Sequence, residues 1–239
     1  MTVALIAATV LTWIFVQGAG LDVRLVTSVC NYGLVPAELT GMQPLGFALP
    51  LGEGMACVVD DAGINWLTPL LTVFLHGGWG HILGNLWFFW VFGNNIEDSM
   101  GPGRFLGFYL LCGLLASAAH VASAPSSAVP TVGASGAVSG IMGAYLVLYP
   151  RARVNLLFFF VFLIRVIPVP AWAALMWWFA WQLVSALPAL QPQNDMSGGV
   201  AFGAHIGGFV AGLALIKLFT DPALLQRRRV LHDERYPAS

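Results

Sequence analysis

A serine within a run of very small residues is the first group in the sequence with the chemistry of a nucleophile. Ser135 lies in the segment Gly133–Gly136 (GASG), at the predicted start of an apolar helix. Small neighbours let a substrate backbone approach the hydroxyl, and the free N–H groups of a helix N-terminus suit a developing oxyanion. The same segment is typical of helix packing, because Gly136, Gly140 and Gly143 form a smooth face. From this segment alone, packing is the favoured interpretation.

A histidine inside the last long apolar run can act as a general base. Around His205, the small residues Ala204, Gly208 and Gly212 recur at four-residue spacing and form a groove for close helix packing. The glycine face after Ser135 is the natural partner for this groove, and their contact would bring the hydroxyl and the imidazole together. A helix–helix hydrogen bond or a proton path would also explain a lone histidine in a membrane span.

Two more polar side chains, His81 and Asn85, stand four residues apart on one predicted helix and therefore share a face. Two neutral donors aimed at one point can stabilise an oxyanion. A hydrogen-bonding pair that fastens two helices together has the same pattern. His76 lies nearer the outer surface and is expected to be structural. No metal site is predicted, because His76 and His81 are not in an HExxH arrangement.

The elements that must position these groups are membrane spans. The chain has 239 residues, of which 58% are hydrophobic and 9% are charged, and its mean hydropathy is +0.80. A soluble domain needs far more charge to cover its surface. Several apolar runs reach the roughly 20 residues that cross a bilayer. The lipid bilayer is therefore the predicted solvent, and the net charge of −1 does not suggest a nucleic-acid partner.

We predict an all-α membrane protein with six spans in a single membrane domain, residues 1–239. The loop at 21–73 is expected to form an extracytoplasmic cap, and 219–239 a cytoplasmic tail. The distribution of arginines predicts that both termini are cytoplasmic. Asn155–Ile164 is expected to be an interfacial or partly embedded piece. The spans are placed at Thr2–Gly20, about Phe74–Ile96, Arg104–Ser123, Gly133–Tyr149, about Ala171–Leu187 and Gly198–Leu218, so that spans two to six occupy 74–218.

The depth of these groups in the bilayer indicates whether they can meet. At roughly 1.5 Å per residue, His205 is expected about 10 Å below the outer end of its helix, and His81 at a similar depth. Ser135 is almost the first residue of its helix, which must therefore begin below the surface. It can, because Gly133–Tyr149 spans only about 25 Å of a hydrocarbon core of about 30 Å. Ser135, His205, His81 and Asn85 are predicted to meet in a cavity open to water from outside.

The three cysteines fall into two groups. Cys30 and Cys57 share the predicted outer loop and can pair if that loop faces an oxidising compartment, a question that the sequence leaves open. Cys112 lies within an apolar run and is expected to be a packing residue.

The stretch from Trp66 to Leu218 resembles the rhomboid family of intramembrane serine proteases. Each motif that carries the likeness is weak alone, but their order, spacing and topology are together highly specific. The motifs are Gly133–Gly136 (GASG), Ala204–Gly208 (AHIGG), and the segment with His76, His81 and Asn85 that leads to Glu97 and Gly101.

This resemblance implies that Ser135 is the nucleophile and His205 its general base, without an acidic third member. The oxyanion hole would consist of His81, Asn85, the Ser135 backbone N–H and the region of Gly133. No cofactor is implied. The implied substrates are transmembrane proteins that enter from the side, near the second and fifth spans. The implied location is the inner membrane of a bacterium.

Two positions depart from the better-known members of this family. Those members have an aromatic residue four positions after the serine, stacked on the histidine, and here that position is Ser139. We therefore expect Phe202 or glycine packing to hold His205. Many members also have a Trp-Arg pair in the first loop, where this chain has Trp66 and Leu67.

The favoured function is hydrolysis of a peptide bond in, or just outside, a transmembrane segment. A non-catalytic member that binds membrane proteins and routes them elsewhere ranks lower, because such a protein is expected to lack the serine or the histidine. A small transporter or channel ranks lower still, because no intramembrane carboxylate and no inverted repeats are visible. A lipid-facing aromatic belt, or alternatively a substrate gate, is predicted at Trp172, Trp177, Trp178 and Trp181.

Overall fold

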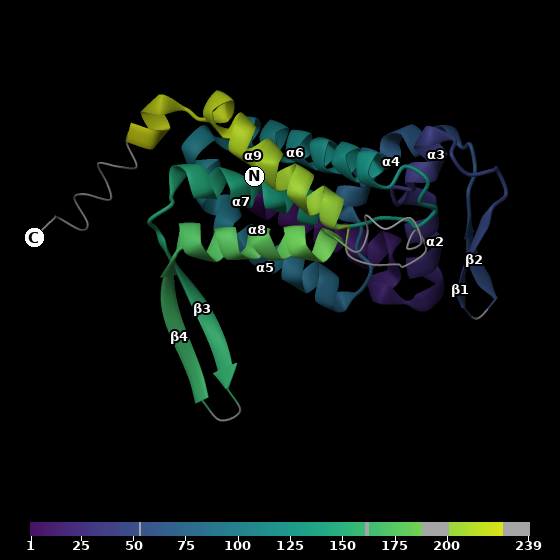
Figure 1. Ribbon diagram of the computed structural model, residues 1–239, viewed down its shortest axis with the longest axis horizontal. Helices are drawn as coiled ribbons and strands as arrows, with labels where there is room; N and C mark the ends of the chain where they lie inside the picture. The colour runs from purple at the N-terminus through teal and green to yellow at the C-terminus, as the bar shows by residue number, and fades with distance from the viewer. Residues whose placement is uncertain (53, 161–162, 188–200, 227–239) are drawn as a thin grey trace, which may run out of the picture.

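The computed structural model describes residues 1–52, 54–160, 163–187 and 201–226. Its long helices run along one axis, with smaller elements at the two ends (Figure 1). The helices are α1 (Thr2–Leu11), η1 (Thr12–Val16), η2 (Gly18–Gly20), α2 (Asp22–Tyr32), α3 (Pro36–Thr40), η3 (Gly63–Leu67), α4 (Thr68–Leu71), η4 (Thr72–Phe74), α5 (Trp79–Met100), α6 (Pro102–Ser123), α7 (Ser135–Leu148), α8 (Ala171–Ala186) and α9 (Phe202–Phe219), and the strands are β1 (Ala48–Gly52), β2 (Met55–Val58), β3 (Arg153–Phe160) and β4 (Leu163–Pro170).

The long helices lie where the sequence predicts apolar spans. The span predicted at Thr2–Gly20 is divided into α1, η1 and η2. Helix α5 begins at Trp79 rather than Phe74, because Gly77 and Gly78 precede it without helical structure. Among the described helices, α6 and α9 are long and apolar enough to cross a membrane. Shorter apolar helices lie at Thr2–Val16, Gly63–Phe74 and Ser135–Leu148. The number of spans therefore stays a prediction, and Gly198, where the last one was expected to begin, lies outside the described residues.

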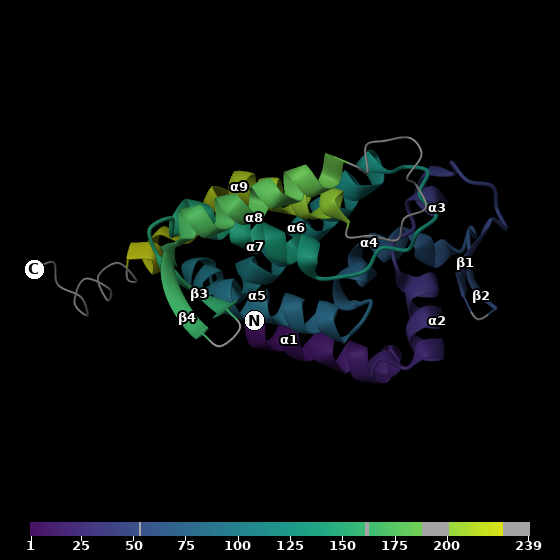
Figure 2. The same ribbon diagram turned by 60° about the horizontal axis from the view of Figure 1, so that its bottom comes forward.

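The expected interfacial piece at Asn155–Ile164 belongs to a β-hairpin, which the prediction of an all-α chain did not include. Strands β3 and β4 pair antiparallel and project away from the helices (Figures 1 and 2). The β-branched and aromatic residues of this segment favour a strand over a helix. Pro168 and Pro170 cannot continue a helix but are tolerated in an edge strand. The position of this hairpin relative to a membrane stays a prediction.

The predicted cap lies at the opposite end of the long helices and contains α2, α3, β1 and β2 (Figure 1). Cys30 on α2 and Cys57 on β2 form a disulfide across 27 residues of sequence. Such a bond restricts the unfolded chain and stabilises the fold by roughly 3–4 kcal/mol in the chain-entropy treatment. Cys112 is a free, buried thiol on α6.

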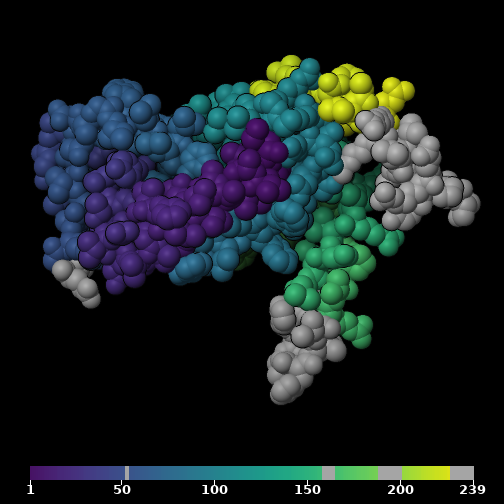
Figure 3. Space-filling model, turned by 180° about the vertical axis from the view of Figure 1, so that it is seen from behind, coloured from purple at the N-terminus to yellow at the C-terminus, as the bar shows by residue number. Residues whose placement is uncertain are grey.

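The helix α1 lies along the outside of the bundle, across the later helices (Figure 3). The backbone N–H of Thr2 donates to Oε2 of Glu97 on α5 at 2.6 Å. Trp13 of η1, which follows α1, is buried and packs edge-on against Trp79 with ring centroids 5.4 Å apart. Together, α1 and η1 thereby contact both ends of α5.

The central helix of the bundle is α7, in which every residue from Gly136 to Tyr145 is buried. A side chain at Gly208 or Gly212 of α9 would collide with the backbone oxygen of Gly136 or Gly140. On the α6 side, a Cβ atom at Gly136 would lie 2.6 Å from the Cβ of Ala116. Backbones this close require glycine. The same holds at Gly143, where a Cβ would collide with the backbone oxygen of Phe209.

Candidate active site

Ser135 is the first residue of α7, and the chain reaches it through a turn that only glycine can make. Gly133 has φ +133° and would place a Cβ 2.8 Å from Cε1 and Nε2 of His81. Its N–H donates to the Thr72 oxygen at 3.0 Å, which fixes the turn against the end of the cap loop. The absence of a side chain at Gly133 therefore lets His81 and Ser135 approach each other.

His205 and Ser135 are in direct contact although they are 70 positions apart. Nε2 of the imidazole lies 2.8 Å from the serine Oγ. The glycine contacts between α7 and α9 produce this distance by bringing the two backbones together. Because α9 begins at Phe202, His205 lies about 4.5 Å from the start of its helix rather than the predicted 10 Å. Both residues thus stand in the first turn of a helix.

The second imidazole nitrogen of His205 has a partner that the sequence argument did not single out. Nδ1 lies 2.8 Å from Oε1 of Gln182 on α8. The Gln182 side chain is 6% exposed, in a helix that is otherwise almost entirely apolar. The rule that drew attention to His81 and Asn85, that polar groups in hydrocarbon are costly and need partners, applies equally to this amide and would have found it.

Aromatic rings also surround the His205 imidazole. Trp178 of α8 lies with its ring centroid 5.9 Å away at 37°, and Phe202 lies edge-on at 6.4 Å and 88°. The Ser139 hydroxyl instead donates to the Ser135 carbonyl oxygen at 2.6 Å. The expectation of Phe202 or glycine packing was therefore incomplete, because Trp178 and Gln182 also hold the ring.

His81 and Asn85 reach the same place from α5. Nδ1 of His81 accepts the backbone N–H of Gly77 at 3.3 Å, and a neutral histidine that accepts at Nδ1 carries its proton on Nε2. That nitrogen faces Gly133, next to Ser135. Asn85 is 7% exposed, and its Nδ2 has no hydrogen-bond partner among the residues that the structure describes.

The four polar residues line one cavity of about 720 Å³. Apolar side chains supply much of the remaining wall, among them Val73, Phe88, Met142 and Trp178. A cavity that is mostly apolar, with a few convergent polar groups, is the usual form of a binding or catalytic site. Of the predicted aromatic belt, Trp172, Trp177 and Trp181 are more than half exposed, whereas Trp178 faces this cavity.

A second buried amide, Gln17, holds the loop that leads into α5. Its Nε2 donates to the His76 oxygen, and its Oε1 accepts the His76 N–H, both at 2.8 Å. The His76 ring is fully buried and packs edge-on against His81 at 5.2 Å. This arrangement agrees with a structural role for His76. Within the described part of the chain, no group of three or more potential ligand side chains could hold a metal ion.

Comparisons of the sequence with known proteins all find members of one family. Residues 64–221 match the family profile described as the Rhomboid domain. The chain is 30% identical over 166 residues to Rhomboid protein 1, mitochondrial, of Saccharomyces cerevisiae, a match that covers 67% of this chain and 44% of the relative. It is 39% identical over 82 residues to Rhomboid protease GluP of Bacillus subtilis, covering 34% of this chain and 16% of the relative.

A further relative is the Putative rhomboid protease YdcA of Bacillus subtilis, 33% identical over 82 residues, which cover 34% of this chain and 41% of that protein. The matches span less than half the length of each of these three relatives. The profile match, by contrast, covers well over half of this chain and includes every cavity residue from Thr72 to His205. The resemblance seen in the motifs is confirmed: this chain belongs to the rhomboid family of integral membrane proteins.

Proposed function

We propose that this chain is an intramembrane serine endopeptidase that hydrolyses peptide bonds in or near transmembrane segments of other membrane proteins. The observation that carries the proposal is the 2.8 Å contact between Ser135 Oγ and His205 Nε2 inside the cavity. A serine hydroxyl is a weak nucleophile unless an adjacent base takes its proton. The membership of the family, which includes relatives named as proteases, supports the same chemistry.

In the proposed reaction, Ser135 Oγ attacks the scissile carbonyl carbon while His205 Nε2 takes the hydroxyl proton. The imidazolium then gives this proton to the leaving amine, and the N-terminal part of the substrate remains as an ester on Ser135. A water molecule, deprotonated by the same nitrogen, hydrolyses the ester and restores the free serine. His205 acts in turn as base and acid, Ser135 is the nucleophile and then the leaving group, and both return to their starting states.

The proposed oxyanion hole consists of Nε2–H of His81, Nδ2–H of Asn85 and the backbone N–H of Ser135, with Gly133 leaving room for the oxygen. An α-helix leaves its first N–H groups without intrahelical partners, and its positive dipole end favours a negative charge. A buried donor without a partner costs about 1–3 kcal/mol. For Asn85 Nδ2, that cost is relieved when the carbonyl oxygen becomes an oxyanion, so the donor stabilises the transition state more than the resting enzyme.

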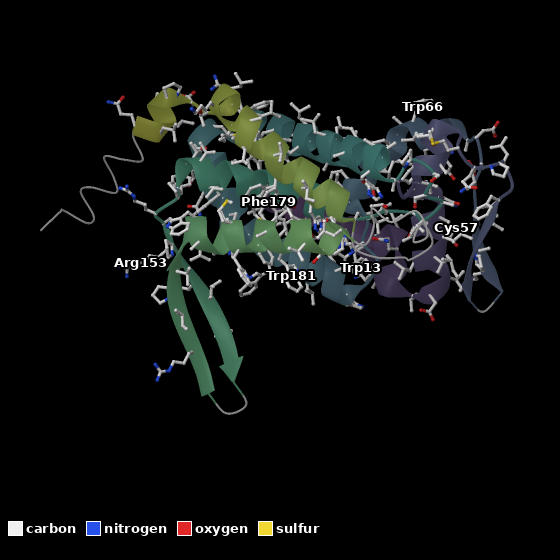
Figure 4. The ribbon with its side chains drawn as sticks, in the orientation of Figure 1. Trp13, Cys57, Trp66, Arg153, Phe179 and Trp181 are labelled. Atoms are coloured by element: carbon white, nitrogen blue, oxygen red, sulfur yellow. A yellow bond between two sulfur atoms is a disulfide. The ribbon has the colours of Figure 1, made fainter. Side chains whose placement is uncertain are left out.

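The proposed topology has six spans, with the cap outside and both termini in the cytoplasm. The Cys30–Cys57 disulfide supports an oxidising environment for the cap. Arg104, Arg151 and Arg153 lie at the ends of α6, α7 and β3 that face away from the cap, the last at the base of the hairpin (Figure 4). Arginine concentrates on the cytoplasmic side of membrane proteins. The cavity then opens toward the outer side, and the substrates are transmembrane proteins.

A cleavage assay in proteoliposomes tests the proposal. The purified protein and its Ser135→Ala variant are each reconstituted with a transmembrane substrate that carries a different tag at each end. We expect the wild type to release both tagged fragments and the variant to release neither. A fluorophosphonate probe should label the wild type and fail to label the Ser135→Ala and His205→Ala variants. Equal cleavage by both proteins, or a folded wild type that neither cleaves nor reacts with the probe, would favour the routing alternative or another nucleophile.

A further inference from the structure

We infer that Gln182 is a positioning residue for the catalytic base: it selects the tautomer and the orientation of His205. This inference rests on the proposed function, since it assigns how the base of that reaction is held. The observation that motivates it is the 2.8 Å contact between Gln182 Oε1 and His205 Nδ1, on the side of the ring opposite Ser135.

Gln182 lies on the buried face of α8 rather than on the face that is exposed. In α8, the buried residues are Ala171, Leu175 and Gln182, on one face, while Trp177 and Trp181 on the other face are 75% and 60% exposed. Figure 4 shows Phe179 toward α9 and Trp181 on the other side of α8. A buried amide costs free energy unless it is hydrogen-bonded. The contact with His205 meets that need for the Gln182 carbonyl oxygen.

The chemical consequence lies in which imidazole nitrogen keeps its proton. An amide oxygen can only accept, so Nδ1 of neutral His205 must carry the hydrogen in this bond. Nε2 then presents a lone pair to Ser135 Oγ, which is the state that a general base requires. In the other tautomer, Nε2–H would point at the serine and could not remove its proton.

Two hydrogen bonds on opposite sides of the ring also define the plane of the imidazole. Trp178 limits the rotation of the ring from one side, at a centroid distance of 5.9 Å. At the position where the better-known members stack an aromatic ring, this chain has Ser139, whose hydroxyl is bonded to the Ser135 carbonyl. Gln182 and Trp178, both on α8, therefore supply the orientation that residue 139 does not.

Cleavage kinetics of Gln182 variants in the reconstituted full chain test this role. Gln182→Leu removes the acceptor, and we expect kcat to fall about tenfold, the value of one neutral hydrogen bond, while KM changes less than about twofold. Gln182→Glu keeps an acceptor oxygen at the same distance and should recover most of the lost rate. Leu183→Ala, on the neighbouring exposed position, is the matched control and should behave as the wild type. A Gln182→Leu variant with wild-type kcat, or a Gln182→Glu variant no better than Gln182→Leu, overturns the inference.

A spectroscopic measurement covers the case in which Gln182→Leu does not fold. In wild-type protein labelled with ¹⁵N-histidine, the His205 resonances, assigned by their loss in His205→Ala, should show a protonated Nδ1 and an unprotonated Nε2. A dominant Nε2–H form overturns the inference even if every variant is unstable. Failure of the inference is separable from failure of the protease proposal. The protease proposal fails if Ser135→Ala cleaves as well as the wild type, or if the folded wild type neither cleaves nor reacts with the probe, and neither result depends on Gln182.

Discussion

The two sides of the active-site cavity are held in different ways. On the side of the nucleophile, Ser135, His205 and Gln182 form a continuous chain of hydrogen bonds at 2.8 Å, and glycine contacts fix the two helices that carry Ser135 and His205. On the α5 side, His81 has one longer bond at 3.3 Å, and Asn85 Nδ2 has no partner among the described residues. One side is satisfied in the resting enzyme, and the other keeps donors available.

This difference corresponds to when each group is needed. In the proposed reaction, the base must be in place before the first step, because proton removal from Ser135 accompanies the first bond that forms. The oxyanion exists only after that attack, so a donor that is already satisfied would have to exchange one partner for another. We therefore expect substitutions on the nucleophile side to lower both stability and rate, and substitution of Asn85 on the α5 side to lower the rate without lowering stability.

The largest expected effect is that of His205→Ala. Without the base, kcat should fall about 10⁴-fold or more, because nucleophile and base act as a unit. Gln182 would lose its imidazole partner at the same time, so the melting temperature should also fall. Both quantities are measurable on the reconstituted protein, by cleavage rate and by thermal unfolding. A His205→Ala variant that retains more than about 1% of the wild-type rate would contradict the assignment of the base.

Asn85→Ala is the corresponding test of the α5 side. Loss of one oxyanion donor should reduce kcat by about 10²–10³-fold. Because Nδ2 has no partner among the residues that the structure describes, the melting temperature should stay the same or rise. Asn85→Asp, which replaces the donor with a negative charge next to the oxyanion, should be at least as slow. A large loss of stability in Asn85→Ala would mean that this amide fastens α5 to a neighbour and that the two sides are alike.

The glycine contacts allow a third, smaller effect to be tested. In Gly208→Ala the new methyl group meets the Gly136 backbone oxygen, so α9 must move away from α7. Overpacking of this kind costs about 1–3 kcal/mol, and the displacement should also lengthen the Ser135–His205 contact. Gly103→Ala is the matched control, since a Cβ there meets nothing within 4 Å. If Gly208→Ala matched the control in both melting temperature and rate, close packing of α7 and α9 would not be what aligns Ser135 with His205.

Much of the site could be predicted from the sequence because it depends on short-range patterns. Small residues at four-residue spacing mark the faces of α7 and α9 that meet, and this contact places His205 on Ser135. Gln182 was missed because neither small residues at four-residue spacing nor a second polar group on the same face accompanies it, although the cost of a polar group in hydrocarbon applies to it equally. The hairpin was missed for a different reason: by periodicity alone, a short apolar run such as Asn155–Ile164 is compatible both with a strand and with a helix at the membrane surface.

The smallest expected effect is a pH dependence of stability that comes from Glu38 in the cap. Measuring it also tests whether the position of Ser135 depends on the cap. Glu38 on α3 has its pKa raised from 4.5 to about 7, chiefly because burial disfavours the charged carboxylate, although the backbone N–H of Asp60 opposes this shift. The neighbouring residue Ala37 donates its N–H to the Ser127 oxygen at 3.0 Å, in the loop that leads to Ser135. Glu38 is therefore the sequence neighbour of a residue that binds the loop leading to Ser135.

The sign of the pH effect follows from the raised pKa. Below pH 4.5 the carboxyl group is protonated in both states, and between about pH 4.5 and 7 only the unfolded chain loses the proton. Stability should therefore fall as the pH rises through this window and level off above it. We expect the free energy of unfolding to change by about 1 kcal/mol or less, because the side chain is partly exposed and solvent screens it.

Histidines titrate in the same range, so the quantity to measure is the difference in melting temperature between the wild type and Glu38→Gln from pH 4 to 8. A difference in melting temperature that stays constant across this range would show that Glu38 ionises normally. A difference that changes with pH, together with a parallel change in cleavage rate, would show that the cap helps to position Ser135.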